Sequence, residues 1–226
     1  MTINQEDSLP EFLTDDEILL VTPEEEVAAS LVIHCFDQAE CIRCLKFGDD
    51  WQKLIKGHLY FEKVLSEILR GQLAYPEEIK LARIAFQQKL QLISAMGLLP
   101  RSYIASIRFL SGIRNKLAHD LDFEVSDEDK FNFLGLLPTA LRAAIEEKSA
   151  EGKDDFGEPI YLLLSVTEAY RHHLWAKRVI GKKRVLTLQR AAANYRKIAS
   201  EAAETFENTR AGRADASVGN ITPTDN

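Results

Sequence analysis

The sequence predicts an all-α protein, and two observations lead to this prediction. Apolar residues recur at the three- and four-residue spacing of helices over most of the 226 residues, and alternation between apolar and polar residues is scarce. Helix-start and helix-stop signals also divide the chain into segments of ordinary helical length. With 46% hydrophobic and 28% charged residues, the composition is that of a globular protein large enough to bury a core.

The first expected helix begins at Thr22-Pro23, where a threonine cap precedes a proline at the first helical position. It should run to about Leu45, and the break at Gly48-Asp49-Asp50 should end it. A second helix is expected from Trp51 to Leu69. Its expected core positions follow helical spacing and are Leu54, Leu59, Val64, Leu65 and Ile68.

The later helices are expected over residues 76–95, 103–118, 126–147, 160–179 and 185–206. Ser126 is a helix cap, and Pro138 should kink or split the helix that follows it. Gly181 should separate the last two helices. The chain then divides into an acidic segment (1–21), a helical bundle (22–147), a basic helical extension (148–207) and a disordered tail (208–226) rich in small and polar residues.

Charge is distributed unevenly around the net value of −7. Residues 1–26 hold nine acids and no Lys or Arg, whereas residues 171–197 hold nine basic residues and no acid. Two partners would suit this basic segment: the acidic start of the same chain or of a neighbouring subunit, or an external anion such as RNA or DNA. The candidate nucleic-acid-binding residues are Arg108, Arg171, Lys177, Arg178, Lys182, Lys183, Arg184 and Arg190.

Other classes of protein are disfavoured by what the sequence lacks. No run of about 18 apolar residues is present, and the first 26 residues are acidic, so we expect a cytoplasmic protein with no membrane partner. Cys35, Cys41 and Cys44 are an odd number of cysteines and predict no disulfide framework. Cys41 and Cys44 lack a second ligand pair at a suitable spacing, so neither a metal nor a cofactor is expected.

The candidate catalytic residues are Arg114, Asn115 and His119, at the end of the helix expected over 103–118. A histidine can transfer protons to and from a ribose hydroxyl or a leaving oxygen, and a guanidinium can stabilise a pentacoordinate phosphate. Asn115 and His119 are four residues apart and share the face opposite Leu110 and Ile113, whereas Arg114 lies nearer the apolar border. Arg114 could therefore act in catalysis or pair with a carboxylate on another helix.

Residues 82–129 resemble the mannitol operon repressor-like proteins, which belong to the wider group of HEPN-like helical bundles. The resemblance is carried by Ala85-Phe86, Lys89-Leu90, Gly97-Leu98-Leu99 and the run from Arg114 to His119. It implies an antiparallel helical bundle that forms a homodimer. Catalytic HEPN proteins are metal-independent ribonucleases that use this Arg and His across a dimer interface, and many are toxins or defence effectors. HEPN toxins silenced by nucleotide transfer carry a tyrosine where this chain has Leu121, so that form of control is not expected.

The resemblance and the charge pattern together lead us to expect a regulatory protein of the repressor-like kind. It would act by contact with RNA or DNA, or with a protein such as a toxin, an antitoxin or a regulator. The first alternative is a metal-independent endoribonuclease that uses Arg114, Asn115 and His119. The second is an immunity or antitoxin protein whose acidic surface neutralises a basic toxin.

Overall fold

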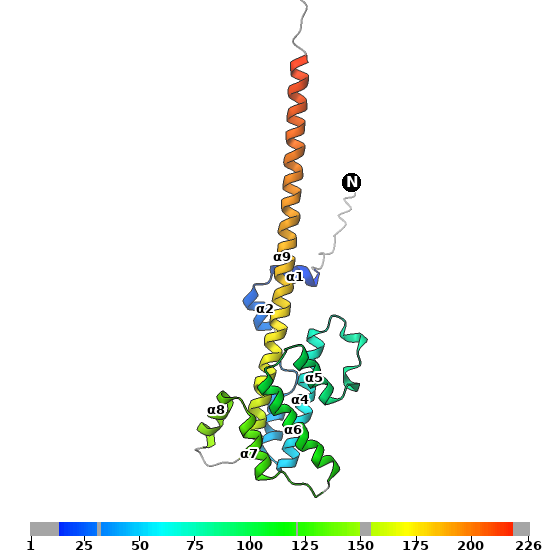
Figure 1. The fold of residues 1–226 in the computed structure, drawn as a ribbon. Helices are drawn as coiled ribbons and strands as arrows, with labels where there is room; N and C mark the ends of the chain where they lie inside the picture. The colour runs from blue at the N-terminus through cyan, green and yellow to red at the C-terminus, as the bar shows by residue number, and fades with distance from the viewer. Residues whose placement is uncertain (1–13, 31–32, 121, 150–154, 219–226) are drawn as a thin grey trace, which may run out of the picture. The chain divides into compact units, whose positions relative to one another are not determined.

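The computed structural model describes residues 14–30, 33–120, 122–149 and 155–218, and every regular element in these ranges is a helix (Figure 1). The all-α prediction is therefore confirmed. The helices are α1 (Asp15–Val21), α2 (Glu24–Ser30), α3 (Gln38–Lys46), α4 (Asp50–Gln72), α5 (Phe86–Ala95), α6 (Arg101–His119), α7 (Asp127–Leu136), α8 (Thr139–Ser149) and α9 (Gly157–Val218).

The chain forms two compact units. Residues 28–178 make one unit, and the described parts of 1–27 and 179–226 make the other. Helix α9 supplies residues to both units, because it runs without interruption through the boundary at residue 179.

The core of the 28–178 unit is built around α4, which contacts α3, α5 and α6. Helix α6 faces it with apolar residues at helical spacing, including Ile107, Leu110 and Ile113. Leu59 was expected in this core but is 55% exposed, and Phe61 is buried instead, because a step of two residues turns a helix by about 200°. The buried apolar residues of α4 are Leu54, Phe61, Val64, Leu65, Ile68 and Leu69.

Two glycines let the start of α9 approach α3 and α4 closely. A Cβ atom on Gly157 would lie 1.7 Å from the carbonyl oxygen of Leu45 at the end of α3. A Cβ atom on Gly57 in α4 would lie 2.5 Å from Cγ2 of Ile160, a fully buried residue in the first turn of α9. Both positions therefore need a residue without a side chain.

Several helix boundaries differ from the sequence prediction. The helix expected over 22–45 is two helices, because Asp37 caps a new start by accepting a hydrogen bond from the Glu40 amide at 3.1 Å. The helix expected from Pro76 begins as two short 3₁₀ turns (Pro76–Glu78 and Leu81–Arg83), and α5 starts only at Phe86. The predicted cap at Ser126 and the split at Pro138 are both confirmed.

Helix α9 is also longer than expected. The break at Gly181 does not occur, since one glycine costs a helix only about 1 kcal/mol relative to alanine. The tail expected to be disordered from Asn208 is helical as far as Val218, and residues 219–226 lie outside the described residues.

The contact at Gly157 gives a testable prediction. Gly157→Ala should destabilise the protein by about 1–3 kcal/mol, because the added methyl group overlaps the backbone at Leu45. Gly181→Ala is the matched control, since a Cβ there would meet no atom within 4 Å and should raise stability slightly. Chemical denaturation of both variants measures the difference, and equal stabilities would contradict the close approach.

Candidate functional site

The last two turns of α6 hold Arg114, Asn115 and His119, and all three residues are exposed. The side of the helix that faces away from Asn115 and His119 is buried through Leu110 and Ile113. Because a helix that packs by one face leaves the other in solvent, this packing presents Asn115 and His119 on the surface. Arg114 lies at the border of the apolar side and is exposed there.

Arg114 is not held by a carboxylate in the described part of the chain. Its closest hydrogen-bond partner is its neighbour, with Nη1 3.5 Å from Oδ1 of Asn115. None of the ion pairs between described residues includes Arg114 or His119. The sequence left two roles open for Arg114, catalysis and pairing with a carboxylate on another helix. Within the described residues, nothing supports the pairing role.

A second set of polar residues lies beside Arg114, on α4 and α5. The sequence did not indicate it. Lys89 is 1% exposed, and its Nζ lies 2.9 Å from Oε1 of Glu62. His58 stacks on Phe86 with ring centroids 4.1 Å apart. Burial lowers the pKa of His58 to about 4, and the positive charges of Arg114 and Lys89 act in the same direction. His58 is therefore neutral near pH 7.

Other polar residues extend this surface along α6. Arg108 is exposed. Lys116 is also exposed, and its Nζ lies 3.4 Å from Oδ1 of Asp129 at the start of α7. Ser111 is buried and accepts a hydrogen bond from Gln87 of α5 at 3.1 Å. The exposed side of α6 thus presents cations and an amide, which can bind phosphate esters, and an imidazole, which can transfer protons to and from them.

Much of the predicted basic segment is bound by the start of the same chain. Lys182 pairs with Asp16 at 2.6 Å, and Arg184 pairs with Glu24 at 2.8 Å. Nζ of Lys183 donates to the carbonyls of Leu19, Leu20 and Thr22, at distances of 2.6–2.8 Å. A cation at the end of α1 satisfies carbonyls that lack helical partners and complements the helix dipole. Of the two partners that the sequence suggested, the acidic N-terminal region is the one that meets these three residues.

The remaining basic candidates have mixed environments. Arg178 donates to the carbonyls of Gly71 and Leu73 at the end of α4. Arg171 is 7% exposed and pairs with Glu168. Lys177 and Arg190 are exposed. The candidate nucleic-acid-binding residues therefore differ in environment, from the buried and paired Arg171 to the exposed Lys177 and Arg190.

Glu168 is the centre of a buried polar cluster that joins α9 to residues 33–35. It is 1% exposed, and its carboxylate accepts two hydrogen bonds of 2.9 Å from Arg171 and one of 2.8 Å from the amide of Cys35. The Cys35 thiol donates a further bond at 3.4 Å. Burial opposes ionisation of Glu168, but these donors outweigh it and hold its pKa below the ordinary value.

His34 and His172 flank the same carboxylate, so that these three side chains offer metal-ligand atoms within 4.8 Å of one another. Oε1 of Glu168 already accepts bonds from Arg171 and Cys35, and Nε2 of His172 lies 2.8 Å from the carbonyl oxygen of Ile33. A metal ion would have to displace these bonds and lie next to a guanidinium. We therefore assign the cluster as a structural anchor.

A surface hollow between the end of α3 and the start of α4 was also not predicted from the sequence. It has a volume of about 670 Å³ and is lined by Phe47 and Trp51 on either side of the Gly48 turn, with Arg43 and Lys56 among its other residues. Phe47 is 66% exposed and Trp51 is 45% exposed. In the sequence, the two aromatic residues on either side of the glycine could have indicated this hollow.

The comparisons with known proteins identify no relative: no protein-family model, no curated protein and no solved structure matches the chain. The resemblance to HEPN proteins therefore stays a prediction from the sequence. Among the described helices, none has the length and apolar character needed to cross a lipid bilayer.

The Glu168 cluster predicts a large loss of stability when its charge is removed. Glu168→Gln should cost about 3–5 kcal/mol, because it leaves the buried guanidinium of Arg171 without a counter-charge. Glu201→Gln is the control, since the pair of Glu201 with Lys197 is exposed and should contribute less than about 1 kcal/mol. Urea denaturation compares the two variants, and similar losses would refute the anchor.

The neutral state of His58 predicts a pH effect on stability. The unfolded chain protonates this residue near pH 6.5 and the folded protein near pH 4, so the unfolded state binds more protons between these values. The melting temperature should therefore fall as the pH falls from 6.5 to 4, and His58→Gln should reduce that fall. His173→Gln, at an exposed position of α9, should leave it unchanged. An identical pH profile for His58→Gln and the wild type would contradict the assignment.

Proposed function

We propose that the protein is a metal-independent endoribonuclease of the HEPN kind, with Arg114, Asn115 and His119 as its active-site residues. One observation carries the proposal. All three side chains are exposed at the end of α6, and Arg114 takes part in no ion pair among the described residues. A purely structural arginine would be expected in a buried or paired position.

The chemistry follows from the properties of these groups. Neutral His119 accepts the proton of a ribose 2′-hydroxyl, and the 2′-oxygen then attacks the adjacent phosphorus. The bond from phosphorus to the 5′-oxygen breaks, a 2′,3′-cyclic phosphate forms, and the leaving 5′-oxygen takes up the proton that His119 accepted, directly or through water. Arg114 donates to the non-bridging oxygens as negative charge accumulates on them, and Asn115 can orient the phosphate through its amide.

A dimer is part of the proposal. Arg114 and His119 are five residues apart, a separation that turns a helix by about 140°, so their side chains leave α6 in different directions. The HEPN resemblance implies that two copies contribute to one site. In such a pair Arg114 of one copy could approach His119 of the other without any reshaping of α6.

A regulator that binds nucleic acid without cleaving it is the second candidate, in keeping with the repressor-like branch of the resemblance. Exposed Arg108 and Lys116 favour it, because cations on the same side of α6 would bind phosphate whether or not His119 transfers a proton. Lys182, Lys183 and Arg184 bind the N-terminal helices, so contact with nucleic acid would fall mainly on α6.

The decisive experiment is cleavage of a mixed panel of RNAs in buffer that contains a metal chelator. His119→Ala should lower the cleavage rate by about 10²–10⁴-fold through loss of proton transfer. Arg114→Ala should lower it by about 10²–10³-fold through loss of charge stabilisation. The controls Arg101→Ala and His173→Ala remove the same side-chain types from exposed positions and should cleave normally.

Each outcome of this assay has a definite meaning. Cleavage that survives both active-site substitutions would remove this site as the source of activity. Salt-sensitive binding of RNA or DNA without cleavage, lost in Arg114→Ala and Arg108→Ala, would select the regulator in place of the nuclease. Absence of both cleavage and binding would reject both candidates.

A further inference from the structure

The surface hollow between α3 and α4 combines aromatic side chains with cations. Phe47 and Trp51 are its two aromatic residues, and Arg43 and Lys56 are its two basic ones. None of the described residues that line it is acidic, although the chain as a whole has a net charge of −7. Its volume of about 670 Å³ is in the range of sites that bind small molecules. These properties suit a ligand that is both aromatic and anionic.

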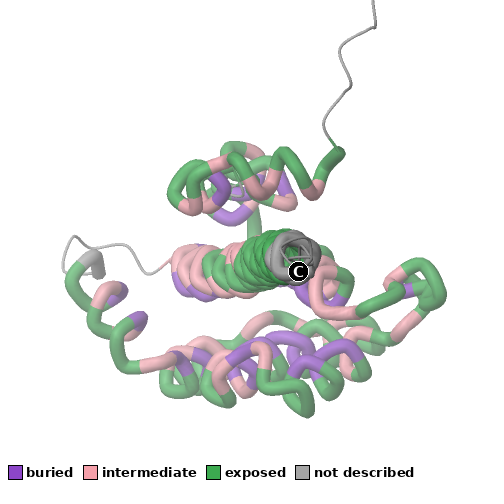
Figure 2. The backbone as a smooth tube through the Cα atoms, turned by 90° about the horizontal axis from the view of Figure 1, so that it is seen from above, coloured by how far each residue is buried: buried purple, intermediate pink, exposed green. Residues whose placement is uncertain are grey.

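The turn between the two helices keeps the aromatic side chains at the surface. Gly48 has a φ of 98°, in the left-handed region that favours glycine, and a Cβ atom there would overlap the side chain of Gln52. Oε1 of Gln52 accepts a hydrogen bond of 3.2 Å from the amide of Asp49, which holds the turn in place. Exposed and buried residues alternate along the helices (Figure 2), and Trp51 and Lys56 of α4 are both exposed. A short stretch of sequence, residues 43–56, therefore builds the hollow.

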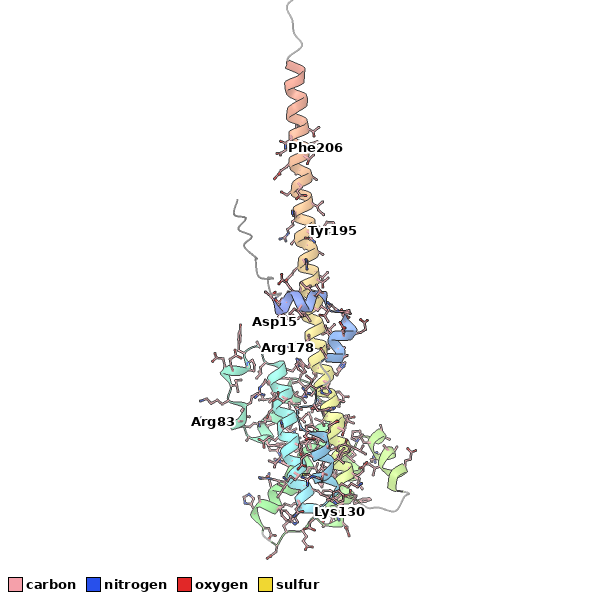
Figure 3. The ribbon with its side chains drawn as sticks, turned by 180° about the vertical axis from the view of Figure 1, so that it is seen from behind. Asp15, Arg83, Lys130, Arg178, Tyr195 and Phe206 are labelled. Atoms are coloured by element: carbon pink, nitrogen blue, oxygen red, sulfur yellow. The ribbon has the colours of Figure 1, made fainter. Side chains whose placement is uncertain are left out.

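Of the two cations in the hollow, only one is matched by a carboxylate. Arg43 donates two hydrogen bonds, of 2.6 and 2.8 Å, to Oε2 of Glu40. Asp50, at the start of α4, pairs at 2.8 Å with Lys130, which is labelled in Figure 3. Lys56 takes part in none of the ion pairs between described residues. Among the lining residues, one positive charge thus has no partner.

We propose that the hollow binds a small aromatic carboxylate, with its ring against Phe47 and Trp51 and its carboxylate on Lys56. The ring covers the exposed aromatic surface, and the carboxylate supplies the single negative charge that Lys56 lacks. A phosphate monoester carries close to two negative charges near pH 7, so it would bring more charge than the unpaired cation can match. The proposal goes beyond the proposed nuclease, since no residue of α6 takes part.

NMR of the full chain is the first test, because Trp51 and Trp175 are the two tryptophans of the chain and each indole N–H gives its own signal. Trp175→Phe identifies the signal of Trp51. Titration with phenylpropionate near pH 7 should shift the Trp51 signal to saturation and leave the Trp175 signal in place. The neutral probe phenylpropionamide should bind about two- to fivefold more weakly, because an exposed ion pair adds only that much affinity.

Calorimetric titration of variants separates the two parts of the site. Trp51→Ala should weaken phenylpropionate binding about tenfold, through loss of aromatic and apolar contact. Lys56→Gln should weaken it about two- to fivefold and leave the affinity for phenylpropionamide unchanged, because the amide has no charge to pair. Lys63→Gln is the matched control, since Lys63 is exposed on α4 outside the hollow and its loss should leave both affinities unchanged.

Four results would overturn the proposal. Two of them are an unshifted Trp51 signal at millimolar phenylpropionate and equal shifts of both tryptophan signals. The third is a Lys56→Gln variant that loses affinity for the carboxylate and the amide alike, and the fourth is tighter binding of phenyl phosphate than of phenylpropionate. None of these measurements involves RNA, so they test the hollow separately from the proposed function of α6.

Discussion

The ion pair between buried Lys89 and half-exposed Glu62 lies close to the end of α6, where both residues and Arg114 act on the pKa of His58. Lys89 is 1% exposed, and a buried ammonium group requires a counter-charge at close range. Glu62 provides it. Arg114 and Glu62 both influence the pKa of His58, yet Glu62 is paired with Lys89 and Arg114 is left exposed. The bundle thus uses a carboxylate of α4 to neutralise its own buried lysine, and the guanidinium of α6 remains free to bind an anion.

Helix α9 meets two different demands along its length. Its first turns contribute Ile160, Leu163 and Leu164 to the core of the 28–178 unit, and Glu168 fixes residues 33–35 through Arg171. Within the other unit, Lys183 binds the carbonyls at the end of α1. Residues 171–197 hold nine basic residues and no acid, and these basic residues have three different roles. One is a buried counter-charge, some satisfy carbonyls at the end of a helix, and others are solvated charges.

The sequence was informative where local chemistry decides the structure. Helical periodicity predicted the class, and the Ser126 cap and Pro138 gave correct boundaries because both act through their own backbone neighbours. It was misleading where distant packing decides: Leu59 of α4 was expected in the core but is exposed, and Arg171 and Lys183 donate to carbonyls more than 130 residues away. The exposure of Asn115 and His119 followed from the α6 periodicity, whereas that of Arg114, at the apolar border, did not. The adjacent His58, Glu62 and Lys89 came from other helices and left no motif.

In the proposed function, the end of α6, and not the basic part of α9, binds nucleic acid. Side-chain NMR of the full chain during titration with an RNA whose 2′-hydroxyl groups are methylated tests this directly, because such an RNA cannot be cleaved. The account predicts that the guanidinium signal of Arg114 and the imidazole signals of His119 shift together and saturate, while the signals of Lys183 and Arg184 stay in place. Shifts confined to Lys182, Lys183, Arg184 and Arg190, with Arg114 and His119 unmoved, would contradict it.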